Sequence, residues 1–506
     1  MISKTIEELL YYATKKLDMK EDNLMYVRNS LLHEFNLNEP YEGEIDKEMI
    51  DSLETPTTLI DELKEDIPEI SQEEIERVMG LITPYPSELN EKFKKLMDES
   101  PDEACKYFYN LMIKNNYIKM DDIKKNIFWI YEGYNNELKI TINLAKPEKD
   151  NKDIAKLVGH VSTSYPKTAL SYTNVGYYGG NGKAARSNIR VVPLKLAYED
   201  WFMQYSPYAY YDEHAIIISK ADAPMHITSD TFRRLLDFVD QFPNYFVGSN
   251  SDLPIVGGSI LNQEHFQGGL EEMPMMRSRS RYALKHPTFD DVKVYYQDWY
   301  NSAFKLVSKN RSNLVRLAAI FLYSWESYND EKNEIISEDF EGRHSTITPI
   351  ARKVNGEYEL YIILRNNKTS VEYPDGIYHA HPEYHNIKKE GIGLIEAMGL
   401  FILPGRLMTE LDLIAQILSN STHPIREVVK TNPSLEKHLN FINALAIKYG
   451  RFNKYDAALE IIKTEVGKVC ENILRNTGVF KDGIDGQLAL FRFIKTCGFE
   501  VVEDEQ

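Results

Sequence analysis

Cysteine is scarce in this sequence. The 506 residues include three, Cys105, Cys470 and Cys497. An odd number without metal-binding spacing excludes a disulfide framework and a cysteine-based zinc knuckle, and it is typical of a reducing compartment. No run of about 18 apolar residues occurs, so we predict no membrane-spanning helix. Glu7 and Glu8 stand where a signal peptide would need an apolar core, and we therefore expect a cytoplasmic protein.

Positive charge is also in short supply. Lys and Arg number 59 against 77 Asp and Glu, a formal net charge of −18. Broad binding to nucleic acid or to an anionic membrane needs a basic face, so we predict neither partner. The excess of acidic residues is unevenly distributed along the chain. Residues 1–150 hold 19 basic and 33 acidic side chains, while residues 151–506 are nearly balanced. A local basic pocket for a small anion is compatible with this distribution.

The hydrophobic fraction of 43% is that of an ordinary soluble globular chain. Over residues 1–126, apolar side chains recur at helical spacing, and Ser71–Glu74 has the form of a capping box. Acidic residues fill the gaps between the apolar positions. We therefore predict a helical N-terminal region over 1–126, a solvated domain without chemistry of its own.

From residue 127 onward, short β-rich runs with turn signals replace the helical pattern. Predicted strands cover 128–134, 138–144, 189–196, 215–219 and 361–364, and predicted helices cover 231–242, 304–325, 394–418 and 435–475. Strands outnumber helices and do not alternate regularly with them. This favours an α+β fold of antiparallel sheets with flanking helices over a doubly wound one.

A glycine-rich stretch, residues 176–183, invites comparison with a phosphate-binding loop. The comparison fails, because that loop needs glycine at 177 and Ser or Thr at 184, where this chain has Tyr177 and Ala184. A surface loop is the better interpretation. Arg186 and Arg190 follow it, and arginine suits bidentate recognition of phosphate.

The most unusual stretch is residues 245–269, in which two glycine pairs bracket a short apolar strand. His265 and Gln267 lie two apart, so in a strand both side chains would face one ligand. A core histidine beside ordinary turn glycines is the plain alternative. The density of glycine and of polar residues favours a site instead, since a neutral imidazole can attack phosphorus and form a covalent phosphoramidate. The polar and glycine residues concerned are Ser249, Asn250, Gly257, Gly258 and Ser259.

Segments throughout the chain resemble those of one family. They are Tyr165–Lys167, Ala185–Asn188 with Arg190, Gln204–Tyr208 with Glu213–His214, Ile347–Arg352, Leu364–Asn367, Gly376–His379, Gly393–Glu396 and Leu403–Arg406. With residues 245–269, they resemble the type II galactose-1-phosphate uridylyltransferases, relatives of the histidine-triad nucleotide transferases. The resemblance covers essentially the whole chain.

The resemblance implies a histidine-triad-like fold, duplicated along the chain. The implied parts are an N-terminal helical region (1–126), a catalytic unit carrying His265 (127–290), a second sheet-plus-helix unit (291–430) and a C-terminal helical region (431–506). The implied reaction moves uridylyl from UDP-glucose to galactose 1-phosphate through a uridylyl-histidine, giving UDP-galactose and glucose 1-phosphate. A homodimer is also implied.

Site roles follow from the same resemblance. His265 would take the uridylyl group, and Gln267 would hydrogen-bond its phosphoryl oxygens. Backbone N–H groups near Gly257, Gly258 and Ser259, with the cations Arg186 and Arg190, would neutralise charge on the phosphate. Ser249 and Asn250 belong to the same predicted substrate site, and Lys388 would touch the sugar phosphate.

Zinc ligands that the family often carries are missing here. A Cys-x-x-Cys pair after Tyr-Pro-Lys is replaced by Thr168 and Ser171, and a histidine before the nucleophile is replaced by Gln263. We therefore predict no structural zinc and no required cofactor. His379 and His381, two apart, suggest a second metal site but lack a convincing carboxylate partner.

Two other functions share parts of this pattern. A dinucleotide phosphorylase or nucleotidyl hydrolase could use the same histidine, and the His-x-Gln spacing does not separate it from a transferase. A nucleotide-sugar binding protein without turnover is the alternative from another class.

Overall fold

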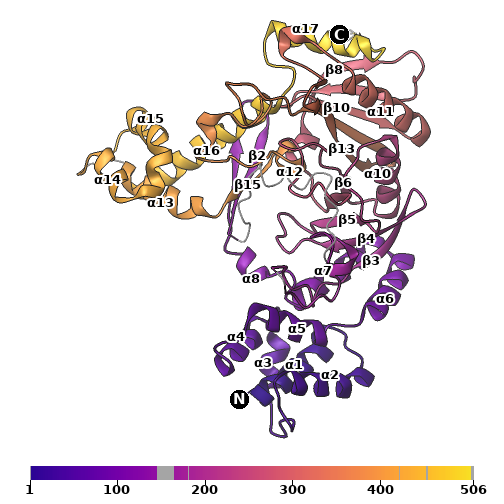
Figure 1. Ribbon diagram of the computed structural model, residues 1–506, viewed down its shortest axis with the longest axis vertical. Helices are drawn as coiled ribbons and strands as arrows, with labels where there is room; N and C mark the ends of the chain where they lie inside the picture. The colour runs from indigo at the N-terminus through magenta and orange to yellow at the C-terminus, as the bar shows by residue number, and fades with distance from the viewer. Residues whose placement is uncertain (1, 145–164, 181, 421, 452–453, 503–506) are drawn as a thin grey trace.

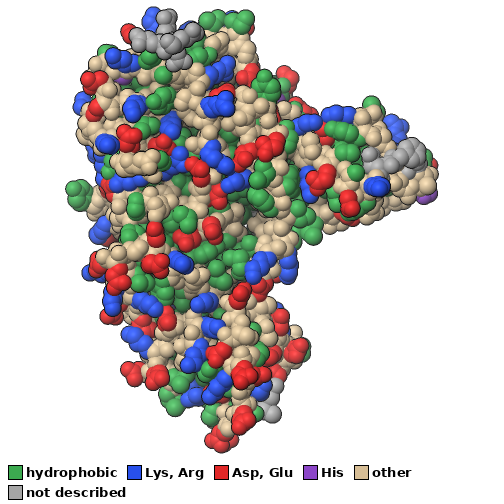
Figure 2. All heavy atoms as spheres, turned by 180° about the vertical axis from the view of Figure 1, so that it is seen from behind, with side chains coloured by type: hydrophobic (Ala, Val, Ile, Leu, Met, Phe, Trp, Pro, Cys, Tyr) green, Lys and Arg blue, Asp and Glu red, His purple; other side chains and the backbone are tan. Residues whose placement is uncertain are grey.

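The computed structural model describes residues 2–144, 165–180, 182–420, 422–451 and 454–502. Figure 1 shows the N-terminal helices at one end, a long central sheet above them, and a helical arm that projects to one side. No helix among the residues described combines the length and the apolar character that crossing a membrane requires. Figure 2 shows acidic and basic side chains interspersed over the face opposite to that of Figure 1.

The N-terminal region is helical, as the sequence predicts. Its helices are α1 (Ile2–Lys16), α2 (Glu21–Glu34), α3 (Lys47–Ser52), α4 (Thr57–Asp66), α5 (Gln72–Ile82), α6 (Pro86–Glu99), α7 (Pro101–Lys114) and α8 (Met120–Ile123). The predicted capping box is present at α5, where the Ser71 side chain accepts from the Glu74 N–H and the Glu74 carboxylate accepts from the Ser71 N–H. Apolar faces of these helices share one core with the central sheet.

The described residues form an eleven-stranded antiparallel sheet. In spatial order its strands are β16 (Glu500–Val502), β8 (Ser280–Lys285), β9 (Lys293–Gln297), β10 (Ala303–Ser308), β14 (Glu357–Asn366), β13 (Ser345–Val354), β6 (Phe246–Gly248), β7 (His265–Gly269), β5 (Ala215–Ser219), β4 (Glu199–Tyr205) and β3 (Val192–Leu196). β6 pairs with β13 through Gly248 opposite Ile350, which joins the strands on either side into one sheet. This architecture confirms the predicted α+β class.

Helices α10 (Ser229–Gln241) and α11 (Arg311–Glu326) cover one face of this sheet. Strand alternation sends Trp201, Met203, Ile217 and Phe266 into the helix-covered core, where the Phe266 ring stacks on Trp201 with centroids 4.8 Å apart. The residues between them face the other side of the sheet. The site lies on that side, because His265 and Gln267 flank Phe266.

A smaller sheet orders β1 (Ile127–Glu132), β2 (Glu137–Asn143) and β15 (Leu400–Pro404), with β15 parallel to β2. It packs against the helical arm and against α12, which precedes β15. The helices are α12 (Leu394–Ala397), α13 (Arg406–Ser419), α14 (Ile425–Thr431), α15 (Leu439–Tyr449), α16 (Tyr455–Thr477) and, beside the large sheet, α17 (Ile484–Thr496). A two-stranded ribbon is formed by β11 (Glu338–Asp339) and β12 (Gly342–Arg343).

Three helix predictions were wrong in part. Residues 304–308 of the predicted helix 304–325 belong to β10, and the predicted helix 394–418 is interrupted by β15. The predicted helix 435–475 is divided into α15, which ends at Tyr449, and α16, which begins at Tyr455. Strands β10 and β15 are both short, almost fully buried, mainly apolar runs next to a helix. The sequence pattern of such a run is the same for a buried strand and for a buried helical segment. Asn310 separates β10 from the helix that follows it. It is the N-cap of α11, where its side-chain oxygen accepts from the Asn313 N–H at 3.2 Å.

Arg190 fastens the N-terminal helices to the sheet. The side chain is 5% exposed, and its guanidinium donates to the carbonyls of Gly80, Thr83 and Pro84 at 2.8–3.0 Å, and to those of Ser187 and Ile189. Burial lowers the pKa of Arg190 to about 10, which leaves it charged at neutral pH. The expected phosphate ligand is therefore a structural residue, because five backbone carbonyls already take its donors.

Arg190→Met should destabilise the protein by about 3 kcal/mol, since it leaves buried carbonyls without donors while keeping the apolar stem. Urea unfolding would measure the loss. Arg233→Met, which removes an arginine that is 59% exposed and paired with Asp230, is the control and should change stability by less than about 0.5 kcal/mol. An unchanged midpoint for Arg190→Met would contradict the structural role.

Candidate functional site

A cavity of about 320 Å³ opens where the N-terminal region, the large sheet and the loop before β15 meet. Seven of the predicted site residues line it: Arg186, Asn250, Gly257, Gly258, Ser259, His265 and Gln267. These residues come from the segment before β3, the loop between β6 and β7, and β7 itself. The structure thus brings together residues up to 81 positions apart in the sequence.

His265 has the tautomer that a nucleophile needs. Its Nδ1 lies 2.8 Å from the backbone carbonyl of Gln263 and must donate to it, because a carbonyl can only accept. The lone pair therefore resides on Nε2. Burial lowers the pKa of His265 below its usual value, and the hydrogen bond to Gln263 only partly opposes this shift. The ring is accordingly neutral at pH 7.

Gln267 is held from behind by His214. The two side chains meet at 3.0 Å between His214 Nε2 and Gln267 Oε1. Burial lowers the pKa of His214 to about 4, so the neutral ring donates through Nε2–H. Tyr210 and Tyr211 hold the ring, with centroids 5.2 and 4.5 Å from that of His214. With its oxygen engaged, Gln267 keeps both amide N–H groups for a ligand in the cavity.

Asn250 connects two walls of the cavity. Its side-chain oxygen accepts from the Leu394 N–H at 2.8 Å, across 144 residues of sequence. Gly258 and Gly393 pack against its amide so closely that a Cβ on either would lie 2.8–2.9 Å from an Asn250 atom. Larger residues at these two positions would displace Asn250, which explains part of the glycine density seen in the sequence.

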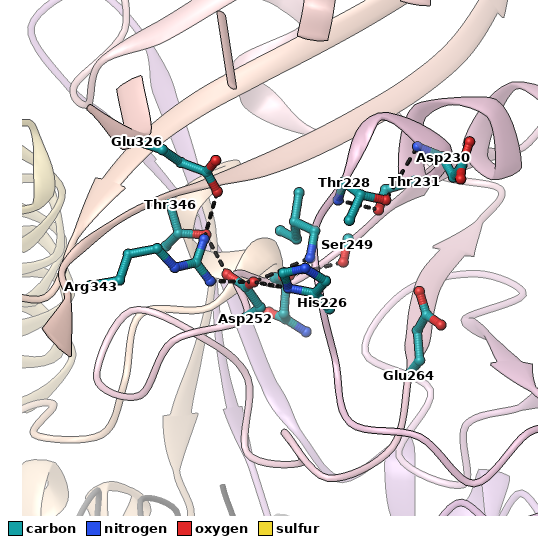
Figure 3. A network of polar contacts seen from close by, with 12 residues as sticks. His226, Thr228, Asp230, Thr231, Ser249, Asp252, Glu264, Glu326, Arg343 and Thr346 are labelled. Atoms are coloured by element: carbon teal, nitrogen blue, oxygen red, sulfur yellow. Dashed lines mark hydrogen bonds and ion pairs between the residues drawn. The ribbon is translucent and has the colours of Figure 1, made fainter. Parts of the chain in front are cut away.

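The loop that carries Asn250, Gly257 and Gly258 is anchored by Asp252 (Figure 3). The Asp252 side chain is 1% exposed and accepts from Arg343 and Thr346 at 2.6 Å, and from the Ile227 N–H at 3.2 Å. His226 lies 3.5 Å away, and Arg343 also pairs with Glu326. Burial raises the pKa of Asp252, but the charge of Arg343 and these hydrogen bonds outweigh it and leave the pKa below its usual range.

Three predicted substrate residues do not line the cavity. Arg190 is bonded to backbone carbonyls at the N-terminal junction. Ser249 is 1% exposed, and its hydroxyl donates to the carbonyl of Asn250. Lys388 is fully buried behind the cavity wall, where its ammonium lies 3.2 Å from Glu390 and 3.0 Å from Glu396. Lys388 therefore lies next to the cavity, where it neutralises the carboxylates of Glu390 and Glu396, which do line it.

The positions that replace zinc ligands form hydrogen bonds instead. The Thr168 hydroxyl donates to Gln263 Oε1 at 3.0 Å, and Gln263 Nε2 donates to the carbonyls of Ser219 and Ala221. Ser171 bonds to Asp222 at 2.8 Å. Neutral hydroxyl and amide groups with their hydrogen bonds already made do not fit a zinc ion.

Among the residues that the structure describes, His379 and His381 do not join a carboxylate in a group that could hold a metal ion. Burial, with the charge of Arg365, lowers the pKa of His379 to about 3, and His381 Nε2 bonds to the Ile377 carbonyl. Within the described ranges, one group of three ligand side chains comes within reach of a common ion, namely Asp339, Glu341 and His344. Lys368 pairs with both of its carboxylates.

Several cavity residues had no predicted role: Tyr117, Gln204, Tyr208, Tyr210, His214, Glu390 and Glu396. His214 and Gln204 stand in segments that carry the family resemblance, so the sequence held a signal for them. Glu396 is also in such a segment. Tyr117 had none, because it lies between α7 and α8 in a region with no motif.

Family models match most of the chain. The model described as galactose-1-phosphate uridyl transferase, N-terminal domain, matches residues 19–224. The model for the C-terminal domain of the same enzyme matches residues 238–428.

Curated relatives match over nearly full length. The galactose-1-phosphate uridylyltransferase of Caldanaerobacter subterraneus is 42% identical over 98% of each chain, and that of Clostridium acetobutylicum is 41% identical over 98% of this chain and 99% of the relative. The enzyme of Lactococcus lactis is 41% identical over 97% and 99%. Among solved structures, a yeast Ap4A phosphorylase aligns over 64% of this chain and 90% of its own at 8% identity, with a TM-score of 0.28 that supports no argument.

Asp252→Asn should lower the free energy of unfolding by about 2 kcal/mol at pH 7, because it removes the charge that Arg343 faces. A carboxylate whose folded pKa is depressed stabilises the protein above its unfolded pKa of about 3.9, and this contribution is lost as pH falls further. The difference between parent and variant should therefore shrink below about pH 4.

Urea unfolding at pH 7 and at pH 3 would measure this. Asp485→Asn is the control, since Asp485 and its partner Lys332 are both 70% exposed. A gap between parent and Asp252→Asn that stays equal at both pH values would contradict the role of the carboxylate charge.

Proposed function

This chain belongs to the galactose-1-phosphate uridylyltransferase family, and from that premise we propose that His265 is its covalent nucleophile. The protein is a UDP-glucose–hexose-1-phosphate uridylyltransferase of galactose metabolism. One observation above all supports the assignment of His265: its Nδ1–H is bonded to the Gln263 carbonyl, so that Nε2 carries the lone pair in a cavity shared with Gln267.

In the first half-reaction, the lone pair of His265 Nε2 attacks the uridylyl phosphorus of UDP-glucose. A P–N bond forms and the P–O bond to glucose 1-phosphate breaks, so the electron pair of that bond leaves on the sugar phosphate. No proton has to be removed from the nucleophile, because the ring is neutral with Nε2 unprotonated. The positive charge that develops on the ring is stabilised by the Nδ1–H bond to the Gln263 carbonyl.

In the second half-reaction, a phosphate oxygen of galactose 1-phosphate attacks the same phosphorus. The P–N bond breaks, its electron pair returns to Nε2, and UDP-galactose leaves. The enzyme regains its starting tautomer without net proton transfer. Two displacements at one histidine predict double-displacement kinetics.

Groups from three parts of the cavity wall can stabilise the negative charge on the phosphoryl oxygens. Gln267 offers the two N–H groups that His214 leaves unengaged. Arg186 offers a guanidinium, and Gly258 and Ser259 bring backbone to the cavity surface. Positioning and neutralisation of this kind supply most of the catalysis in phosphoryl transfer.

The carboxylates Glu390 and Glu396 suit the hexose rather than the phosphates. Both line the cavity, and carboxylates accept hydrogen bonds from sugar hydroxyls but repel phosphate. The buried Lys388 ammonium lies within 3.2 Å of both and reduces the cost of keeping them ionised there. Lys388 thus positions the hexose ligands without reaching the sugar phosphate itself.

The remaining properties follow from the same assignment. We propose that the enzyme binds no zinc at Thr168, Ser171 and Gln263 and needs no other cofactor, because these side chains are already hydrogen-bonded to protein groups. We also propose that it acts in the cytoplasm. The homodimer that the resemblance implies stays a prediction.

His265→Ala should abolish turnover, because it removes the atom that accepts the uridylyl group, and a fall of at least about 10⁴-fold in kcat is expected. Incubating the parent with UDP-glucose alone should add the mass of one uridylyl group to the protein. The variant should gain none, as intact-protein mass spectrometry would show.

His286→Ala is the matched control, because His286 is similarly buried but lies outside the cavity lining. It should keep both the adduct and the turnover. Full activity of His265→Ala, or an adduct on another residue, would sink the assignment. Turnover with water or inorganic phosphate but not with galactose 1-phosphate would favour a hydrolase or phosphorylase.

His214→Phe should lower kcat about tenfold with little change in KM, because the Gln267 amide loses the bond that fixes its orientation. Phenylalanine keeps the ring between Tyr210 and Tyr211 but has no donor. His214→Gln, which can place an N–H near the same point, should recover much of the rate. Equal kcat for the Phe variant and the parent in steady-state assays would refute the positioning role.

A further inference from the structure

Tyr117 brings the N-terminal helical region into the catalytic cavity. It lies in the turn between α7 and α8, and it lines the cavity together with Arg186, Tyr208 and His265. The helical region was expected to have no chemistry of its own. A side chain from this region in the cavity wall makes the region part of the site.

The Tyr117 hydroxyl is a donor without a partner among the described residues. The residue is 7% exposed, and its hydroxyl makes no hydrogen bond to any of the residues that the structure describes. Burial raises the pKa of Tyr117 to about 12, against the opposing charge of nearby Arg186. The phenol therefore keeps its proton at neutral pH. Since the hydroxyl has no acceptor among the described residues, its proton is available to a ligand in the cavity.

Asn115 ties Tyr117 to the segment that carries Arg186. Its side-chain oxygen accepts from the Tyr117 N–H at 3.0 Å, and its amide donates to the Asn188 carbonyl at 2.7 Å. Asn188 returns a bond from its own amide to the Asn115 carbonyl at 3.1 Å. Asn115 and Asn188 are both almost fully buried. The turn and the Arg186 segment are thus held as one unit.

The same junction is reinforced nearby. Arg190 donates to carbonyls in the last turn of α5 and in the loop that follows it, and a Cβ on Gly80 would lie 2.5 Å from the Ser187 carbonyl oxygen. The helical region and residues 186–190 therefore pack with no room for adjustment. This rigidity preorganises the two donors before substrate arrives.

A neutral phenol donor beside a guanidinium is a set that suits a phosphate oxygen. The charge of Arg186 would repel an ammonium ligand. A carboxylate could accept from both donors, but the substrates of this enzyme carry phosphates. We propose that Tyr117 is a substrate-binding residue of the N-terminal region, whose hydroxyl donates a hydrogen bond to a phosphate oxygen of the bound nucleotide sugar. The proposal rests on the function assigned above, because it needs UDP-glucose in this cavity.

Tyr117→Phe in the full-length chain tests the proposal, since it removes the hydroxyl and keeps the ring. We expect kcat/KM for UDP-glucose to fall about tenfold. The thermal unfolding midpoint should not fall, because no hydrogen bond within the protein is lost. A kcat/KM within twofold of the parent would overturn the proposal.

Tyr109→Phe is the matched control. Tyr109 lies in α7, is 8% exposed, and packs its ring on Tyr205 with centroids 5.0 Å apart, outside the cavity lining. Its kinetics should equal those of the parent. An equal loss in both variants would mean that any buried phenol of this region matters, and the proposal would fail.

Two further readouts separate the possible failures. If the parent forms no uridylyl adduct with UDP-glucose, the assigned function fails and this proposal with it. If the parent forms the adduct and Tyr117→Phe is unimpaired, this proposal alone fails. Both half-reactions involve the uridylyl phosphorus and a hexose 1-phosphate, so kcat/KM for galactose 1-phosphate should fall together with that for UDP-glucose, and this result supports the contact. A loss for UDP-glucose that leaves galactose 1-phosphate unchanged would count against it.

Discussion

The hydrogen bond between His265 Nδ1 and the Gln263 carbonyl is the interaction on which the chemistry of this site depends. It decides which ring nitrogen holds the proton, and so which one can attack phosphorus. The carbonyl stays in place because the Gln263 side chain is bonded to Thr168, Ser219 and Ala221. This amide network holds the chain in place two residues before His265.

The strand that carries His265 also divides the two sides of the sheet. Phe266 is locked into the core by its stacking on Trp201, and this fixes the rotation of β7. Its neighbours His265 and Gln267 must then face the cavity, since a strand alternates. A slip of one residue would bury both polar side chains in the core and expose Phe266, a cost that keeps the register unique. Core packing and catalytic geometry are therefore the same constraint.

The cavity is built by long-range connections more than by any one segment. Asn250 bonds to Leu394, Asp252 to Arg343, and Asn115 to Asn188, each across 70 or more residues of sequence. The Asn250 and Asn115 bonds are buried, and the Asp252–Arg343 bond is partly buried, so all three are shielded from water to some degree. The acidic excess of the chain does not dominate this interior, where Arg186 and Lys388 stand against the carboxylates of Glu390 and Glu396.

Much of the function could be predicted from the sequence. Ten site residues were predicted from the His-x-Gln spacing, the glycines around it and the family segments, and seven of them, the proposed nucleophile His265 and Gln267 included, line one cavity. Strand periodicity and glycine conformation are local properties, so a sequence carries this signal. The N-terminal helices and the α+β class followed from periodicity for the same reason. The strands β10 and β15 were missed because short buried apolar runs have the same pattern in either structure.

Only the tertiary structure decided what Arg190, Lys388 and Tyr117 do. Arg190 and Arg186 look alike in sequence, yet one faces the cavity and the other spends its donors on backbone carbonyls of α5 and its following loop. Tyr117 belongs to no motif and reaches the cavity through the buried asparagine pair. These roles depend on which partners lie across the interface, and such partners are set by packing between distant segments, which no local pattern encodes.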